Sequence, residues 1–282
     1  MKKLALSSLI AVFAVSGAHA ANVIDGNPLY MPKANHFYSV TDLSSHSENT
    51  SDWMLSEDFG YGVTDKVAVN VKLAASEAVE DFAEDEMFDR YGIGNLSLGA
   101  TFRALDKGEW KVDVYGEYAT QGAALAGGMP TTIFAHSDAA DDTFWFDKDL
   151  IDYKWTAGVR GGYTTSLFTV AGHVAFDYLN TESFNWGDDG IHALRLGVDG
   201  QYVIDSNWNL VAGVEYRGIL DDQIVKNNGT WNGMFGVNYN IDTTKFVGAY
   251  VKGSLNHHEG TAADEWGWDD GFGFGAKFGI DF

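Results

Sequence analysis

The chain of 282 residues has 40 acidic and 18 basic side chains, 33 Gly, 3 Pro and no Cys. Its net charge of −22 argues against nucleic acid as a partner, because phosphate binding needs basic patches. The lack of Cys excludes disulfides as a source of stability.

The first twenty residues, MKKLALSSLIAVFAVSGAHA, predict a secretory signal peptide. Basic residues open the segment, an apolar run follows from Leu4 to Val15, and it ends on the small-residue pattern Ala18-His19-Ala20. A membrane-spanning helix is the alternative, but the apolar run is too short to cross a bilayer. We therefore expect cleavage before Ala21.

Downstream, apolar and polar residues alternate in stretches of about ten, which indicates strands with two different faces. Val170 and Val174, for example, alternate with Ala171 and His173. We predict about twelve strands, with 10 or 14 as alternatives, and the first two are the least regular. They lie near 36–45, 51–61, 67–73, 95–103, 110–118, 153–164, 168–178, 194–202, 208–217, 231–241, 247–255 and 272–282.

The links between these strands alternate in length. Short links fall after even-numbered strands, at 62–65, 105–109, 165–166, 205–207 and 242–244. Long links follow odd-numbered strands, at 77–89, 121–151, 181–189, 220–228 and 257–269, and the link 45–50 is intermediate. An up-and-down sheet then has its short turns and both chain termini at one end, which is typical of outer-membrane barrels.

Aromatic residues recur at both ends of the predicted strands. Near the short turns lie Tyr61, Trp110, Tyr163, Tyr202, Trp208, Tyr239 and Phe282. Near the opposite ends lie Trp53, Tyr91, Trp155 and Trp231. Two such bands match the aromatic girdles of a membrane barrel.

The polar face of the strands distinguishes a membrane barrel from a soluble barrel or sandwich. It carries Lys, Arg, Asp and Glu of both signs, and burying each in a dry core would cost several kcal/mol unless it is paired. A water-filled lumen removes that cost. We therefore predict an all-β, transmembrane, antiparallel up-and-down β-barrel.

The chain ends GFGFGAKFGIDF, with large apolar residues at every second position and an aromatic as its last residue. Together with the signal peptide and the asymmetric links, this stretch resembles the outer-membrane β-barrel proteins of Gram-negative bacteria, the porin-like class. The resemblance implies an assembly signal at Phe274, Phe278, Ile280 and Phe282, read by the barrel-assembly machinery. It also implies location in the outer membrane, with its lipids and lipopolysaccharide as partners.

The implied organisation is a signal peptide (1–20), an N-terminal periplasmic segment (21–35) and a transmembrane barrel (36–282). The longest loop, 121–151, contains Phe144-Trp145-Phe146. We expect these rings to pack among the loops, with insertion into the lumen as the alternative.

Catalytic and metal-binding patterns are weak. Rim residues His136 with Asp138, and His257-His258-Glu259 with Asp264, could serve a hydrolase, but loop acids and histidines are usually only solvated. The acidic loop 77–89 has the oxygen ligands that divalent cations prefer but no EF-hand spacing. We predict no catalytic residues, no metal site and no cofactor, and do not expect an enzyme.

Charges on the predicted inner face carry the functional hypothesis. The expected pore-lining residues are Lys72, Arg103, Lys111, Asp113, Glu117, Lys154, Arg160, His173, Asp177, Arg195, Asp199, Glu215, Arg217, Lys252 and Lys277. Rings of charge set pore selectivity, so we predict a channel for passive diffusion of small polar or charged solutes. The alternatives are a non-conducting structural or surface-interaction barrel and, third, a rim-located hydrolase.

Overall fold

The computed structural model describes residues 26–46, 52–78, 96–120, 153–180, 191–220, 229–255 and 272–282. These ranges contain twelve strands, and each overlaps one predicted from the sequence. The strands are β1 (Phe37–His46), β2 (Asp52–Thr64), β3 (Val67–Ala78), β4 (Leu96–Lys107), β5 (Trp110–Thr120), β6 (Tyr153–Thr164), β7 (Phe168–Asn180), β8 (Ile191–Val203), β9 (Trp208–Ile219), β10 (Gly229–Asn240), β11 (Lys245–Ser254) and β12 (Phe272–Asp281). Within the same ranges, no helix is long and apolar enough to span a membrane.

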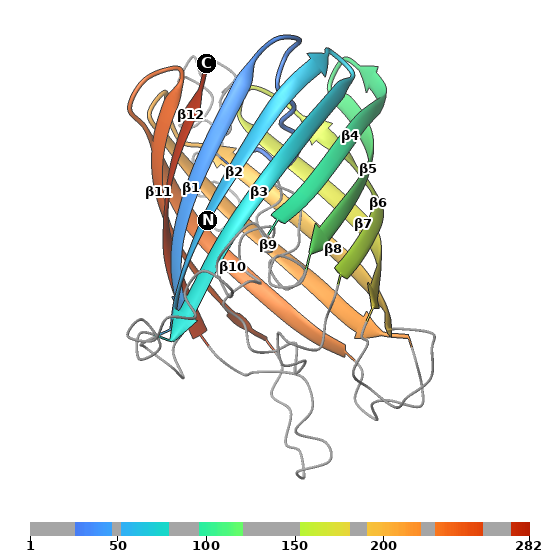
Figure 1. Cartoon of the computed structure of the whole chain (residues 1–282). Helices are drawn as coiled ribbons and strands as arrows, with labels where there is room; N and C mark the ends of the chain where they lie inside the picture. The colour runs from blue at the N-terminus through green and yellow to red at the C-terminus, as the bar shows by residue number, and fades with distance from the viewer. Residues whose placement is uncertain are drawn as a thin grey trace, which may run out of the picture.

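The twelve strands close into one antiparallel barrel (Figure 1). Each strand pairs with its sequence neighbours, and β1 completes the cylinder against β12. At this seam the Phe37 N–H donates to the Phe282 carbonyl at 2.7 Å, and the Phe282 N–H donates back at 2.9 Å. Closure satisfies the backbone groups of both edge strands, as a bilayer requires. The predicted antiparallel up-and-down barrel is confirmed, and twelve rather than 10 or 14 strands form it.

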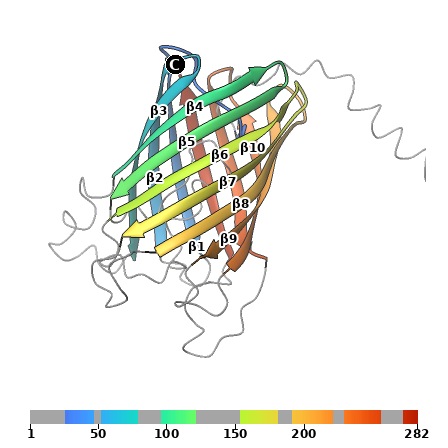
Figure 2. The same cartoon turned by 90° about the vertical axis from the view of Figure 1, so that its right-hand side faces the viewer.

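The observed connections follow the predicted asymmetry. The links 65–66, 108–109, 165–167, 204–207 and 241–244 are short and gather at one rim, together with the C-terminus (Figures 1 and 2). Gly108 adopts a φ of 62° in the turn between β4 and β5, a backbone conformation that glycine allows without strain. The longer links follow the odd-numbered strands, and apart from Leu220 and Leu255 their residues lie outside the described ranges.

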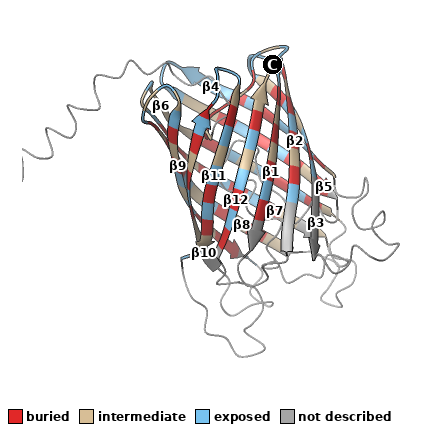
Figure 3. Cartoon of the chain, turned by 90° about the vertical axis from the view of Figure 1, so that its left-hand side faces the viewer, coloured by how far each residue is buried: buried red, intermediate tan, exposed pale blue. Residues whose placement is uncertain are grey.

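Exposure alternates along the strands (Figure 3). The exposed positions carry many large apolar side chains and the buried positions carry most of the charged ones, so the barrel has an apolar outer wall and a polar inner wall. In β12, Phe274 and Phe278 are exposed, whereas Gly275 and Gly279 are buried. This arrangement is the reverse of a soluble barrel, whose apolar face points inward. It is the pattern expected of a cylinder surrounded by lipid.

The two aromatic bands are present as ring contacts. At the rim of the short turns, the rings of Trp110 and Tyr163 lie 5.1 Å apart. At the opposite end, the Tyr118 and Trp155 rings lie 4.7 Å apart. Similar contacts join Phe37 with Tyr61, Trp208 with Tyr239, and Tyr216 with Trp231. Tyr91 and the side chain of Trp53 lie outside what the structure describes.

A hydrogen-bonded polar cluster interrupts the apolar outer wall near the seam. Glu57 of β2 lies on the same face as the exposed Leu55 and Phe59. Its two carboxylate oxygens accept hydrogen bonds from Ser39 and Thr41 of β1, each at 2.5 Å. A charge facing lipid is unfavourable, and these two bonds offset part of that cost. The polar residues on the outer row also explain why the first two strands look least regular in the sequence.

Inside the barrel, aromatic rings lie over glycines of the neighbouring strand. A Cβ atom added to any of these glycines would come within 2.3 Å of the facing ring. The pairs, each directly opposite in register, are Tyr38 with Gly60, Tyr115 with Gly158, Phe246 with Gly279 and Tyr250 with Gly275. Gly275 and Gly279 of β12 therefore leave space for the aromatic rings of Tyr250 and Phe246 on β11.

Replacing one of these glycines is expected to destabilise the barrel. Gly158→Ala would put its Cβ 2.3 Å from the Tyr115 ring and force the ring to shift, at a cost of about 1–3 kcal/mol. Gly116 on the neighbouring strand is the matched control, because the nearest atom to an added Cβ is 3.6 Å away. Gly116→Ala should be neutral or stabilise by about 0.5–1 kcal/mol. Urea unfolding in lipid vesicles compares the two, and equal effects would contradict this packing.

Candidate functional site in the barrel lumen

The fifteen residues predicted to line a pore are all among the described residues. Thirteen of them are buried, while the side chains of Lys111 and Lys277 are 22% and 13% exposed. Two further acids, Asp42 and Asp58, are buried on the inner face of β1 and β2. The sequence prediction omitted them, because these two strands alternate less clearly.

Many inward charges contact partners of the opposite sign. His173 lies between two carboxylates, with Nδ1 3.1 Å from Asp199 and Nε2 2.8 Å from Glu215. The other Glu215 oxygen accepts from Arg217 Nε at 2.6 Å. The residues come from strands β7, β8 and β9, so this network ties one side of the inner wall together.

Further pairs extend this pattern around the lumen. Arg195 Nη2 donates to Asp177 at 2.9 Å, and Thr156 donates to the same oxygen at 2.6 Å. At the seam, Asp42 accepts from Tyr250 at 2.9 Å and lies 3.6 Å from Lys277 Nζ. Pairing of this kind removes much of the cost of burying charge.

Residues 26–36, here called the N-terminal segment, run into the lumen from the rim of the short turns. Leu29 and Tyr30 are 2% and 7% exposed. The Tyr30 ring packs edge-on against Tyr38 at 5.9 Å, and its hydroxyl donates to Asp281 at 2.9 Å. Burial, and then the Asp281 charge, raise the pKa of Tyr30 above its usual range, so this donor stays protonated. The sequence suggested a periplasmic segment here without foreseeing its entry into the barrel.

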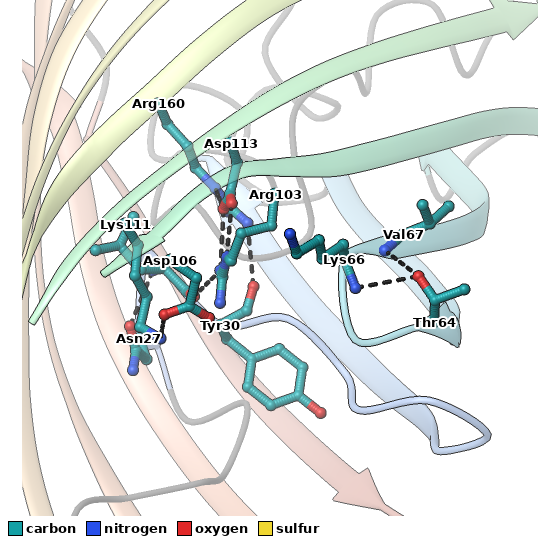
Figure 4. Close-up of polar contacts among 11 residues, drawn as sticks. Asn27, Tyr30, Thr64, Lys66, Val67, Arg103, Asp106, Lys111, Asp113 and Arg160 are labelled. Atoms are coloured by element: carbon teal, nitrogen blue, oxygen red, sulfur yellow. Dashed lines mark hydrogen bonds and ion pairs between the residues drawn. The ribbon is translucent and has the colours of Figure 1, made fainter. Parts of the chain in front are cut away.

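Two arginines and one aspartate hold the N-terminal segment in place (Figure 4). Asp113 of β5 accepts from Arg103 Nε at 2.8 Å and Nη2 at 3.1 Å, and from Arg160 Nε at 2.9 Å. Arg103 Nη2 also donates to the Leu29 carbonyl at 2.7 Å, and Arg160 Nη2 donates to the Tyr30 carbonyl at 3.0 Å. We call Arg103, Asp113 and Arg160 the arginine site.

A cavity of about 820 Å³ lies beside the arginine site at the rim of the short turns. Its walls come from the N-terminal segment, from the turns between strands, and from Arg103, Lys111, Asp106 and Asp281. The wall thus carries both signs of charge and reaches one of the two arginines.

Strand alternation predicted that Arg103, Asp113 and Arg160 face inward, but not that they form one site. The two arginines also donate to backbone carbonyls of the irregular N-terminal segment, and such contacts leave no side-chain pattern in the sequence. The candidate hydrolase residues His136, Asp138, His257-His258-Glu259 and Asp264 lie outside the described residues, as do most of the acidic loop and Phe144-Trp145-Phe146. Among the side chains described, none group as three or more His, Asp or Glu able to hold a metal ion.

No protein-family model matches the sequence, and no curated protein is similar to it at a significant level. Solved structures, in contrast, share the architecture. The NanC porin aligns with a TM-score of 0.56 at 7% identity, over 86% of this chain and 98% of the porin. The KdgM porin aligns with a TM-score of 0.52 at 6% identity, over 87% of this chain and 99% of the porin.

An outer-membrane channel from Pseudomonas putida F1 has a TM-score of 0.51 and 12% identity, covering 92% of this chain and 98% of the channel. At these identities the likeness concerns the fold. Together with the apolar outer wall and the two aromatic bands, it shows that the chain is a β-barrel of the bacterial outer-membrane type.

Proposed function

We propose that the protein is an outer-membrane channel for the passive diffusion of small polar or charged solutes. The observation that carries the proposal is the inner wall, which bears charges of both signs, most of them buried, on strands between β1 and β12. Charged groups along a lumen set which solutes pass and how fast. The predicted pore-lining residues are the groups we assign to this role.

The rival function is a non-conducting structural or surface-interaction barrel. The extent of side-chain burial favours it, because ion pairs such as those of His173 and Asp177 could simply fill and stabilise the lumen. Twelve-stranded barrels lie between small barrels filled by side chains and wide porins. A measurement of ion flow therefore separates the two functions.

Purified protein in planar lipid bilayers is expected to give discrete current steps. Folding is checked first by the shift in gel mobility on heating, which a folded barrel shows. Because the N-terminal segment occupies one mouth of the lumen, we expect these steps to be small or infrequent. Silence of both the intact protein and a variant lacking residues 26–32, with folding verified, would defeat the channel proposal.

Other partners predicted from the sequence belong to the same proposal. They are lipopolysaccharide around the outer rim and the barrel-assembly machinery, acting on Phe274, Phe278, Ile280 and Phe282. Phe274, Phe278 and Phe282 are exposed and face away from the lumen, which leaves them accessible to another protein during assembly.

A further inference from the structure

We propose that the arginine site binds the carboxylate group of acidic solutes, and that the Leu29 and Tyr30 carbonyls occupy it until such a solute displaces them. This inference rests on the proposed channel function and adds a solute class and a means of opening. The N-terminal segment would then close the lumen, and an acidic solute would open the lumen by displacing the segment.

The chemistry of the site favours a carboxylate. Two guanidinium groups share one carboxylate, Asp113. Besides Asp113, which also accepts from Arg103 Nη2, the two Nη2 atoms donate to neutral carbonyls. Hydrogen bonds between ionised partners are about twice as strong as those between neutral ones, and planar guanidinium groups match carboxylates in shape. A carboxylate solute would therefore replace neutral acceptors with a charged one of matching shape.

The N-terminal segment competes because it is tethered. A tethered group acts at a high effective concentration, so modest contacts keep it bound. Close to the arginine site, the segment is also held by the Tyr30 bond to Asp281 and the ring contact with Tyr38. Nearer the rim, the Ala34 N–H donates to Asp65 and the Asn35 N–H donates to the Gly62 carbonyl. The rim contacts can persist while a solute takes the place of the Leu29 and Tyr30 carbonyls, so only the inner part of the segment needs to be displaced.

A solute can approach the site from the rim of the short turns. The cavity of about 820 Å³ at this rim is lined by Arg103 and by residues of the N-terminal segment, among them Leu29 and Tyr30. A solute in this cavity thus meets Arg103 and the two residues whose carbonyl groups compete for the site. Displacement of the segment would then expose the second arginine, Arg160.

The test follows release of the segment directly. The chain has no Cys, so Leu29→Cys introduces a single thiol at a buried position. Its rate of reaction with a water-soluble maleimide is measured in the folded protein with added gluconate, or with sorbitol as the neutral molecule of equal length. Gluconate should raise the rate about tenfold, as expected for a charge-assisted contact replacing a neutral one, and sorbitol should not.

Arg160→Lys and Arg103→Gln, each combined with Leu29→Cys, are the matched variants. Arg160→Lys keeps the charge but loses the planar fork, so it should weaken the gluconate response, and Arg103→Gln should abolish it. A rate that gluconate leaves unchanged, that sorbitol raises equally, or that responds fully in both variants would overturn the inference. Conductance is recorded in parallel. If gluconate raises the reaction rate but no current flows, carboxylate binding at the arginine site is supported and the channel function is contradicted. If current flows but gluconate has no effect on the rate, the channel function is supported and carboxylate binding is contradicted.

Discussion

Deletion of residues 26–32 is expected to raise single-channel conductance severalfold. These residues include Leu29 and Tyr30, which are buried in the lumen and anchored to both arginines. Without them, water and ions replace protein at one mouth, and the current that a pore carries grows with its open cross-section. The barrel should survive, because Arg103 and Arg160 keep Asp113 as their shared partner. Planar-bilayer recordings of both proteins provide the measurement.

A reversible disulfide supplies the control within one protein. A Cβ atom built on Gly26 lies 3.6 Å from Cβ of Val211 on β9, a separation that suits a disulfide. Gly26 has a φ of 95°, so a Cys there carries strain of about 1–3 kcal/mol. In a Gly26→Cys, Val211→Cys variant, oxidation should hold the segment and suppress current, and reduction should restore it. Equal currents in the two redox states would show that the segment does not control the pore.

Asp113→Asn is expected to destabilise the barrel by about 3–5 kcal/mol, the usual cost of removing one partner from a buried ion pair. Asp113 is fully buried and accepts three hydrogen bonds from the two arginines. Without its charge, two buried guanidinium groups are left with too little negative charge nearby. Urea unfolding of the protein folded into lipid vesicles measures the loss.

The matched control is Asp106→Asn, which also removes an acid paired with a base. Asp106 and Lys111 contact at 3.3 Å, but their side chains are 44% and 22% exposed. An exposed pair contributes at most about 1 kcal/mol. If the two substitutions cost the same, the arginine site would not be the buried cluster described here.

The strands could be predicted because each has two chemically different surroundings. Val170 faces lipid and His173 faces the lumen, so the period of two is present in the sequence itself. Strand count, the asymmetry of the links and the inward direction of residues such as Arg160 all follow from that period. The same reasoning fails where a residue breaks the rule, as Glu57 does on the outer wall.

The candidate site could be predicted only as separate side chains. Arg103 and Leu29 are 74 residues apart, and Arg160 and Tyr30 are 130 apart. Their contacts depend on how an irregular segment enters the cylinder, which no periodicity records. The packing of Tyr250 over Gly275 likewise depends on the register of β11 against β12, because a shift of one residue would turn the ring toward lipid.

The way the barrel closes has a consequence for circular permutation. Five short turns occupy the rim, and the place of a sixth is taken by Phe37 and Phe282, which hydrogen-bond to each other. The N-terminal segment leads from this gap into the lumen. Joining residue 282 to residue 37 by a turn, and opening the chain at the link 108–109, would keep all twelve strand pairings. Such a permuted barrel would again have five turns at this rim, and no N-terminal segment in its lumen. Whether the lumen is blocked therefore depends on where the chain begins, and not on how the strands pair.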